Sequence, residues 1–328
     1  MAGVSRVGLV LGGGGITGAA YEMAALMAIE LATGWSPNTA DVLVATSSGA
    51  FVGSLVRHDA LNLDSLVMPG DERADVAERI RSHVYTRGRG PGIGKWVRHG
   101  IVPGIRRPGL TMVLGTPAPY HASGVAGWVQ THIGEEAAAR WPTRPTAVVA
   151  YDIRRSTRVP FGTETAPTVG IADAVAASSA VPLVFTPYQI DDGLYVDGGV
   201  VSGTHADLVL ASAVALDFVL VLAPMAAKLQ RRRARFHEGM FDRVGLRALR
   251  SEIEAIKSKW ADCEVLVLNP SPSVQNAMWP NPMSPSRAVA TFTRTLVAMR
   301  RTLAQPEVWQ PLRRHIALSD VTPRAAAH

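Results

Sequence analysis

The chain has 328 residues, 47% of them hydrophobic, so it can bury a large core and is not expected to be disordered over most of its length. Its single cysteine, Cys263, excludes an internal disulfide framework and a cysteine-built zinc site, and fits a cytoplasmic location. The formal net charge of +6 suits an anionic surface, but no nucleic-acid-binding motif accompanies it, so no nucleic-acid partner is expected.

The first predicted elements are a strand and a helix joined by a glycine run. The stretch "RVGLVL" (residues 6–11) predicts a buried strand, and residues 18–34, rich in Ala, Leu, Met and Glu, predict a helix that ends near Gly34. The run also interrupts the apolar N-terminal stretch, so no signal peptide is predicted. Between strand and helix, "GGGITG" (residues 13–18) has the spacing G-x-G-x-x-G. Its N–H groups could hold a dinucleotide pyrophosphate or a developing oxyanion.

The second predicted strand, residues 41–46, separates these two interpretations. A dinucleotide site needs an acidic residue at the end of this strand, where it binds the ribose hydroxyls. Asp41 instead stands at the start of the strand. The end of the strand reads "ATSSGA", which leads through a serine into a helix rich in small residues.

This order of strand, serine and helix is typical of a nucleophile elbow, in which a sharp turn exposes the serine hydroxyl. It predicts Ser47 as the nucleophile, with Ser48 as the competitor one residue later. Ala45 and Gly49 are the small residues that allow the backbones to pass closely, although Ala45 stands where the elbow usually has glycine. A serine that caps a helix is the structural alternative.

Residues 67–119 are the most irregular region, rich in Gly, Pro and Arg. Such long segments are typically lids, binding loops or disordered insertions, so a lid over the strand ends and a flexible insertion are both open. Residues 87–109 mix Arg and Lys with apolar side chains, as a segment on an anionic membrane surface would, or as a solvated loop could. Residues 228–237 form a second basic segment.

Three further buried strands are predicted at residues 146–153, 217–224 and 264–270, separated by helical stretches. This alternation predicts an α/β fold, a three-layer sandwich with a mostly parallel central sheet covered by helices on both faces. Residues 208–227 are apolar but contain Asp217, so a buried helix, a turn and a buried strand are expected there instead of a transmembrane helix. A single domain over residues 1–328 is predicted.

A nucleophilic serine needs a base. His58, His121 and His205 are available, but each is more often a surface or capping residue. The stretch from Ala174 to Leu208 offers a carboxylate instead: a small-residue helix stops at Pro182, and a strand then leads into Asp197, Gly198 and Gly199. The two glycines permit a tight turn and the close approach of another backbone, although an ordinary turn has the same pattern.

Three blocks in this order resemble the patatin-like phospholipases, a family of α/β lipid acyl hydrolases with a serine-aspartate dyad. "GGGGITG" is similar to the family's oxyanion loop, "ATSSGA" to its G-x-S-x-G elbow, and "ASSAVPLVFTP" with "YVDGGV" to its helix, proline and Asp-Gly-Gly block. The resemblance covers roughly residues 6–224. Residues 225–328 are then an extension of helices and a strand without a matched function.

The resemblance implies that Ser47 attacks an ester carbonyl while Asp197 accepts its proton, without a cofactor or metal. The N–H groups of Gly13, Gly14 and Gly15 would hold the oxyanion. The expected substrate is a lipid or fatty acyl ester, cleaved in the manner of a phospholipase A or lysophospholipase.

Two departures from the family pattern motivate an alternative function. Ala45 replaces the first elbow glycine, and Thr17 stands where the family has Arg or Lys. The alternative is a catalytically inactive relative that binds lipid or an anionic membrane peripherally.

Overall fold

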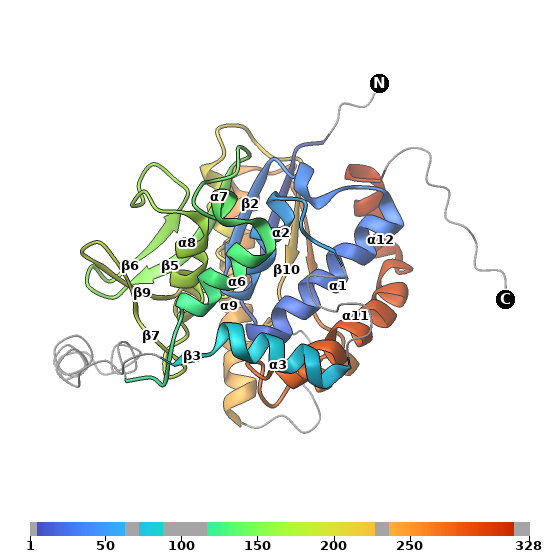
Figure 1. Cartoon of the computed structure of the whole chain (residues 1–328). Helices are drawn as coiled ribbons and strands as arrows, with labels where there is room; N and C mark the ends of the chain where they lie inside the picture. Colours follow the sequence, from blue (N-terminus) through green and yellow to red (C-terminus); the bar gives the residue numbers. More distant parts are fainter. Residues whose placement is uncertain (1–4, 63–71, 88–116, 227–235, 318–328) are drawn as a thin grey trace.

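A mixed β-sheet forms the centre of the protein (Figure 1). The computed structural model describes residues 5–62, 72–87, 117–226 and 236–317, with the backbone alone for 236–244. The sheet strands within these residues are β1 (Val7–Leu11), β2 (Val42–Thr46), β5 (Thr146–Asp152), β6 (Thr157–Phe161), β8 (Tyr188–Ile190), β9 (Gly193–Asp197), β10 (Phe218–Leu222) and β11 (Glu264–Leu268). Their spatial order is β11-β10-β1-β2-β5-β9-β8, and β6 also pairs with β5.

Five adjacent strands, from β11 to β5, run parallel, which confirms the five predicted strands and the mostly parallel sheet. Parallel strands bring their carboxyl ends to one edge, so Leu11 of β1 lies level with Ala45 of β2. The strand β9 instead runs antiparallel to β5, with Asp197 opposite Ala150. Because Thr46 pairs with Val149 of the same β5, Asp197 and the residue that follows β2 lie at the same level of the sheet.

Helices cover both faces of the sheet, as predicted. They are α1 (Gly15–Thr33), α2 (Ser48–Arg57), α3 (Arg73–Val84), α6 (Ser123–Ile133), α7 (Glu135–Ala138), α8 (Ile171–Ser178), α9 (Phe236–Lys259), α10 (Pro272–Met278), α11 (Ala288–Leu303) and α12 (Pro306–His315). Leu9 and Leu43 belong to the core cluster shared with α1, α2 and α8, whereas Val10 and Val44 belong to the cluster shared with α9. Alternate residues of each strand thus enter opposite cores.

The predicted helix after the glycine run is α1, which begins at Gly15, three residues before the predicted start. It ends where predicted: Gly34 adopts the left-handed conformation, φ 73°, and its N–H donates to Glu30 O. The predicted helix before Pro182 is α8, which ends earlier, at Ser178.

The region predicted to be irregular, 67–119, contains the helix α3, so the expectation of a structureless segment is wrong for this part. Val76, Ile80 and Val84 lie on its buried face at helical spacing, and Glu72 and Asp75 form a capping box at its start. Residues 67–71 and 88–116 lie outside the described residues, and most of the basic segments 87–109 and 228–237 does too. The predictions of a lid and of membrane contact therefore stay predictions.

A second, three-stranded sheet of order β3-β4-β7 was not predicted. Its strands are only two residues long: β3 (Thr86–Arg87), β4 (Tyr120–His121) and β7 (Phe185–Thr186). The rings of Tyr85, Tyr120 and Phe185 pack together beside it, with centroids 4.8 Å apart for Tyr85 and Tyr120. This sheet joins three segments that are distant in sequence.

The apolar stretch 208–227 does not form a long helix. It contains the end of a 3-10 helix, η6 (Ala206–Ala211), then a turn and β10, so the predicted strand is confirmed and the predicted buried helix is a short 3-10 helix. No helix in the described ranges is both long and apolar enough to cross a membrane.

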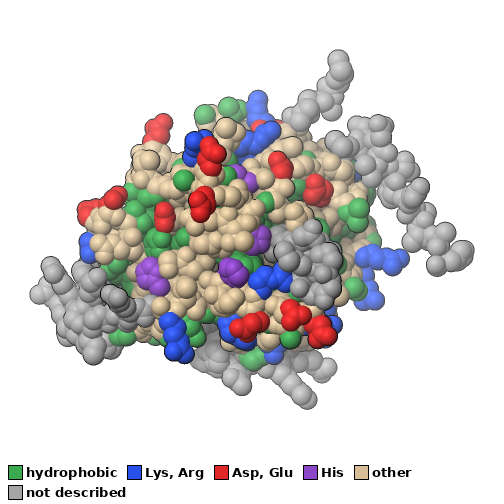
Figure 2. Space-filling view, in the orientation of Figure 1, with side chains coloured by type: hydrophobic (Ala, Val, Ile, Leu, Met, Phe, Trp, Pro, Cys, Tyr) green, Lys and Arg blue, Asp and Glu red, His purple; other side chains and the backbone are tan. Residues whose placement is uncertain are grey.

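The C-terminal region completes the fold. The strand β11 forms an edge of the central sheet, and Ala288 and Phe292 of α11 join the core beside α1. On the face shown in Figure 2, the acidic and basic side chains that are drawn in colour are interspersed.

Candidate active site

Ser47 occupies a strained turn between β2 and α2. Its backbone has φ 54° and ψ −121°, a conformation that non-glycine residues rarely adopt. The turn brings α2 against the end of β1: a methyl group on Gly49 would overlap the carbonyl oxygen of Leu11. The strained serine and the close approach at Gly49 give the geometry of a nucleophile elbow.

Ala45 is accommodated in the elbow by a glycine of the following helix. Ala45 is fully buried, and a Cβ placed on Gly53 of α2 would lie 3.3 Å from the Ala45 Cβ and 2.9 Å from Leu43 Cδ2. The methyl group of Ala45 therefore fits because residue 53 has no side chain.

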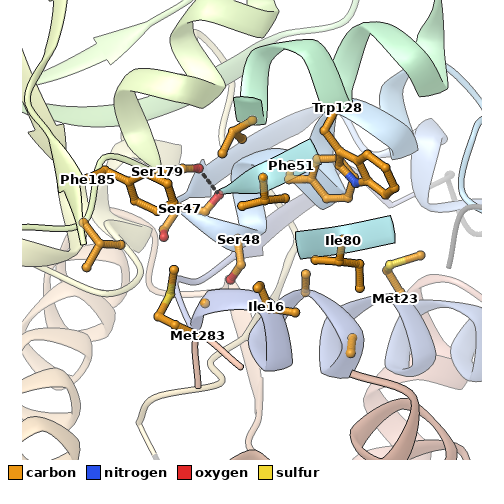
Figure 3. Close-up of a pocket in the computed structure, with 16 residues that line it drawn as sticks. Ile16, Met23, Ser47, Ser48, Phe51, Ile80, Trp128, Ser179, Phe185 and Met283 are labelled. Atoms are coloured by element: carbon orange, nitrogen blue, oxygen red, sulfur yellow. Dashed lines mark hydrogen bonds between the residues drawn. The ribbon is translucent and has the colours of Figure 1, made fainter. Parts of the chain in front are cut away.

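Two serines that the sequence analysis assigned no role hold the backbone of Ser47. The Ser47 N–H donates to Ser178 Oγ at 2.8 Å, and Ser178 Oγ donates to Val149 O at 2.6 Å. Ser179 Oγ lies 3.4 Å from Ser47 O (Figure 3). Both serines belong to the block "ASSA", and their position at the end of α8 was the signal that could have identified them.

Asp197, the last residue of β9, meets Ser47 in a buried environment. It is 4% exposed, and burial raises its pKa from 3.8 to about 6, while hydrogen bonds from the Ser47 side chain and the Gly199 N–H lower it. The Gly199 N–H donates to Asp197 Oδ1 at 2.7 Å. A carboxylate with this pKa is a stronger base at neutral pH than an exposed aspartate, and it is still ionised there.

The two glycines after Asp197 are required by space. A Cβ on Gly198 would lie 2.5 Å from Val149 O, and one on Gly199 would lie 2.9 Å from Asp197 Oδ1. The turn that they form is η5 (Gly198–Val200), a single turn of 3-10 helix.

The glycine loop lies beside Ser47, but one of its three predicted donors is already used. The Gly13 N–H donates to Gly203 O at 2.7 Å, so in this conformation it is not free to bind an oxyanion. Gly14 is the N-cap of α1 and Gly15 its first residue, with φ 63°. Among the described residues, no backbone acceptor pairs with the N–H groups of Gly14 and Gly15. These two groups, at the positive end of α1, are the donors available to an oxyanion.

Thr17 does not point a polar group into open space. It is fully buried, its N–H donates to Pro282 O at 3.0 Å, and its hydroxyl has no partner in the described part of the chain. A charged side chain at this position would therefore have to be buried beside residues of the C-terminal region.

An apolar pocket opens at Ser47. It encloses about 700 Å³ of space, including its opening to solvent. Its wall comes from α1, α2, α3, α6, the segment 179–185 and the C-terminal region, and the residues labelled in Figure 3 are Ile16, Met23, Ser47, Ser48, Phe51, Ile80, Trp128, Ser179, Phe185 and Met283. Figure 3 shows Ser47 toward one end of this pocket and Trp128 and Met23 toward the other.

The C-terminal region contributes to the site in a way that the sequence did not reveal. Met283 lines the pocket, and the Tyr85 hydroxyl donates to Met283 O. Because Met283 is far from Ser47 along the chain and belongs to no motif, no local signal could have identified it.

The three candidate histidines bond elsewhere. His58 Nδ1 contacts Ser54 O at 2.8 Å, and His121 Nδ1 accepts a backbone N–H. His205 is fully buried, and its Nε2 lies 3.1 Å from Gly198 O. In the described ranges none of these three rings hydrogen-bonds to Ser47. Asp197 is the titratable group that the fold brings to the serine.

The dinucleotide interpretation has no support in the geometry. Asp41 accepts the Val7 N–H at 2.6 Å, at the amino ends of β1 and β2, whereas the glycine loop lies at their carboxyl ends. The carboxylate therefore stands on the wrong side of the sheet to meet a ribose beside the glycine loop.

Comparisons with known proteins place the chain in a family. A family model described as patatin-like phospholipase matches residues 9–210. No curated protein matches the chain in a sequence search.

Two solved structures align with the chain. VipD from Legionella pneumophila is 12% identical, with a TM-score of 0.38, and the alignment covers 92% of this chain and 67% of that one. Human GIVD cytosolic phospholipase A2, solved in complex with methyl gamma-linolenyl fluorophosphonate, is 10% identical, with a TM-score of 0.35 and coverage of 95% and 60%. The chain thus spans about two thirds or less of the length of these two proteins.

Proposed function

The chain belongs to the patatin-like phospholipase family, and from this premise we propose that it is a serine acyl hydrolase that cleaves carboxylic esters of lipids. One observation carries the proposal: Ser47, held at φ 54° in an elbow, lies beside the buried Asp197, whose pKa its side chain lowers, and opens onto an apolar pocket. This arrangement joins a nucleophile, a base and a binding site for an acyl chain.

In the proposed reaction Ser47 Oγ attacks the ester carbonyl carbon, and its proton passes to the Asp197 carboxylate. The N–H groups of Gly14 and Gly15 stabilise the oxyanion that forms. When the tetrahedral intermediate collapses, the ester C–O bond breaks and protonated Asp197 gives its proton to the leaving alcohol. Asp197 then removes a proton from water, which attacks the acyl-enzyme carbonyl carbon. When this second intermediate collapses, the bond from that carbon to Ser47 Oγ breaks, the acid is released, and Asp197 returns the proton to Ser47 Oγ.

The pocket supports a fatty acyl group as the part of the substrate that is recognised. Its lining is almost entirely apolar, and burying each methylene group of a chain gains about 0.8 kcal/mol. We place the acyl chain along the pocket from Ser47 toward Trp128 and Met23. A phospholipid or lysophospholipid fits this arrangement, with its head group outside the apolar wall.

A fluorophosphonate probe, which reacts covalently with activated serines, tests the proposal together with hydrolysis of a short-chain nitrophenyl ester. Wild-type protein is expected to be labelled on Ser47 and to hydrolyse the ester. Ser47→Ala is expected to lose labelling and at least about 1,000-fold of the activity.

Ser48→Ala is the matched control, since Ser48 is the neighbouring serine and also lines the pocket. It should keep both labelling and most of the activity. Label on Ser48, or full activity in Ser47→Ala, would overturn the assignment of the nucleophile.

The alternative of an inactive lipid-binding relative rests on Ala45 and Thr17. Gly53 makes room for Ala45, and Thr17 is buried away from the pocket lining, so neither departure removes a group from the dyad. Lipid that co-purifies with a protein that the probe does not label would favour the alternative. A screen of esters over chain length and head group would then define the substrate of an active protein.

A further inference from the structure

A buried carboxylate lies on the face of the sheet opposite the pocket. Glu252 of α9 is 8% exposed. Leu249 and Ile256 of the same helix are buried in the core cluster on that face, together with Val10 and Val44 of β1 and β2. The position of Glu252 is therefore fixed by packing. A buried carboxylate is costly unless hydrogen bonds compensate for its lost hydration.

Glu252 obtains these hydrogen bonds from one short loop, residues 202–206. Ser202 Oγ donates to Glu252 Oε1 at 2.5 Å, and Thr204 Oγ1 donates to Oε2 at 2.6 Å. The Ala206 N–H donates to Oε2 at 2.9 Å. Ser202 Oγ in turn accepts the N–H groups of Thr204 and His205, at 3.2 and 3.3 Å. The Glu252 carboxylate thus accepts hydrogen bonds from three of the five residues of this loop.

The same loop contacts both halves of the active site. Gly203 O accepts the Gly13 N–H at 2.7 Å, which fixes the start of the glycine loop. His205 Nε2 lies 3.1 Å from Gly198 O, and because a carbonyl can only accept, the ring donates this hydrogen bond. Gly198 directly follows Asp197. The loop therefore bonds to the segment that holds the oxyanion donors and to the segment that holds the base.

Of the possible metal ligands around Glu252, His205 Nδ1 is free: it is buried and has no hydrogen-bond partner among the described residues. The two carboxylates are not free. Atoms of His205, Asp207 and Glu252 lie within 4.8 Å of one another. Both oxygens of Glu252 already accept hydrogen bonds, however, and Asp207 accepts two from Arg158, at 2.9 and 2.6 Å. A cation would have to displace these partners, so the hydrogen bonds favour a structural linkage.

We propose that Glu252 is a positioning residue for the reaction: by holding residues 202–206, it sets the placement of the glycine loop relative to Asp197. This inference rests on the proposed function. It means that a side chain with no contact to Ser47 determines how well the oxyanion donors and the base act together. Misplacement of such groups by about 1 Å can reduce the rate about 100-fold.

The test compares Glu252→Ala and Glu252→Gln with Glu254→Ala. Glu254 lies on the same helix and is exposed, so it is a matched control for the loss of a glutamate from α9. The maximal rate of each variant is measured with a nitrophenyl ester and divided by the concentration of sites that react with the fluorophosphonate probe, which gives kcat per reactive site. This ratio is insensitive to a partly unfolded preparation, which a merely stabilising role would produce.

Glu252→Ala is expected to lower kcat per reactive site about 10- to 100-fold, with KM changed less than about threefold. Glu252→Gln keeps one oxygen acceptor and should lose less. Glu254→Ala should equal wild type. Unchanged kcat per reactive site in Glu252→Ala would overturn the proposal. A wild-type activity that is lost on treatment with a chelator and restored by zinc would also overturn it, because the cluster would then bind a metal.

Hydrogen exchange gives a second readout that does not depend on activity. In Glu252→Ala, amides in residues 10–15 and 197–206 should both exchange faster than in Glu254→Ala. Faster exchange confined to residues 202–206 would contradict the linkage. If the wild-type protein does not hydrolyse esters, the proposed function fails, whereas the exchange result still decides the inference about Glu252.

Discussion

The two sides of the central sheet adjoin the proposed dyad with opposite chemistry. On one side, Ser47 opens onto a pocket whose wall is apolar and which we propose to bind the acyl chain. On the other side, Glu252 and residues 202–206 form a buried polar cluster that contacts the backbone of the site. Apolar packing tolerates changes of shape, whereas hydrogen bonds have fixed partners and directions. The pocket is therefore suited to select a substrate, and the polar cluster to fix geometry.

Asp197 lies between these two sides, so its replacement should give the largest effect. Asp197→Asn is expected to lower kcat about 1,000-fold or more, because the amide cannot accept the proton of Ser47. The preference among acyl-chain lengths should not change, since the pocket is intact. Steady-state kinetics on a series of nitrophenyl esters measures both quantities. A changed chain-length preference would show that the two sides are not separable.

The same variant should be more stable than wild type at neutral pH. Burial raises the pKa of Asp197 from 3.8 to about 6, so the folded protein binds this proton more tightly than the unfolded chain. The contribution of this group to the free energy of unfolding is fully present below pH 4 and is lost as the pH rises through about 6. The loss is at most about 3 kcal/mol. Unfolding in urea should give Asp197→Asn a larger free energy of unfolding than wild type at pH 7 and an equal one at pH 4. Equal stability at both pH values would contradict the raised pKa.

The pH dependence of the wild-type reaction tests the base itself. With a pKa of about 6 for Asp197, kcat/KM should be constant above pH 7 and fall about tenfold for each pH unit below 6. Initial rates at low substrate concentration from pH 4.5 to 8 give this profile. A midpoint near 4 would indicate that Asp197 is solvated in the working protein, and a base on the polar side would then have to be sought.

The far end of the pocket should control chain length without affecting the dyad. The ring of Trp128 packs against His83 and His132, with centroids 4.5 and 4.6 Å apart. Trp128→Ala lengthens the pocket, and three further methylene groups would then shift the ratio of kcat/KM for long over short esters by about tenfold or more. Because a ratio is measured, partial unfolding does not affect it. Trp309→Ala on α12 is the control and should leave the ratio unchanged.

The smallest effect is expected at Ala45, the strand residue two positions before Ser47. Ala45→Gly removes a methyl group that Gly53 already accommodates. Activity should stay within about twofold, and stability should fall by about 0.5–1 kcal/mol, the usual effect of glycine in a strand. Thermal unfolding and ester hydrolysis measure the two effects. A large gain in activity would mean that Ala45 distorts the elbow after all.

Much of the fold could be predicted because its signals are local. The apolar runs around Leu9, Leu43 and Leu220 each predict a buried strand, and Gly34 marks the end of a helix by its backbone conformation. The helix α3 also had such a signal, in the spacing of Val76, Ile80 and Val84, which the Gly, Pro and Arg content of the surrounding region obscured. Composition averaged over a long window was a poorer guide there than periodicity over twelve residues.

For the site, the sequence by itself determined the residue types that chemistry requires at short spacing: the glycine run, the serine between a strand and a helix, and the aspartate before two glycines. These are local because a strained turn or a close backbone approach restricts which residues fit. Only the tertiary structure decided that Gly13 donates to Gly203, that Met283 lines the pocket, and that Glu252 lies beneath the loop joining the two halves. Those contacts join segments far apart along the chain, and no spacing within either segment specifies which partner the packing of the sheet brings to it.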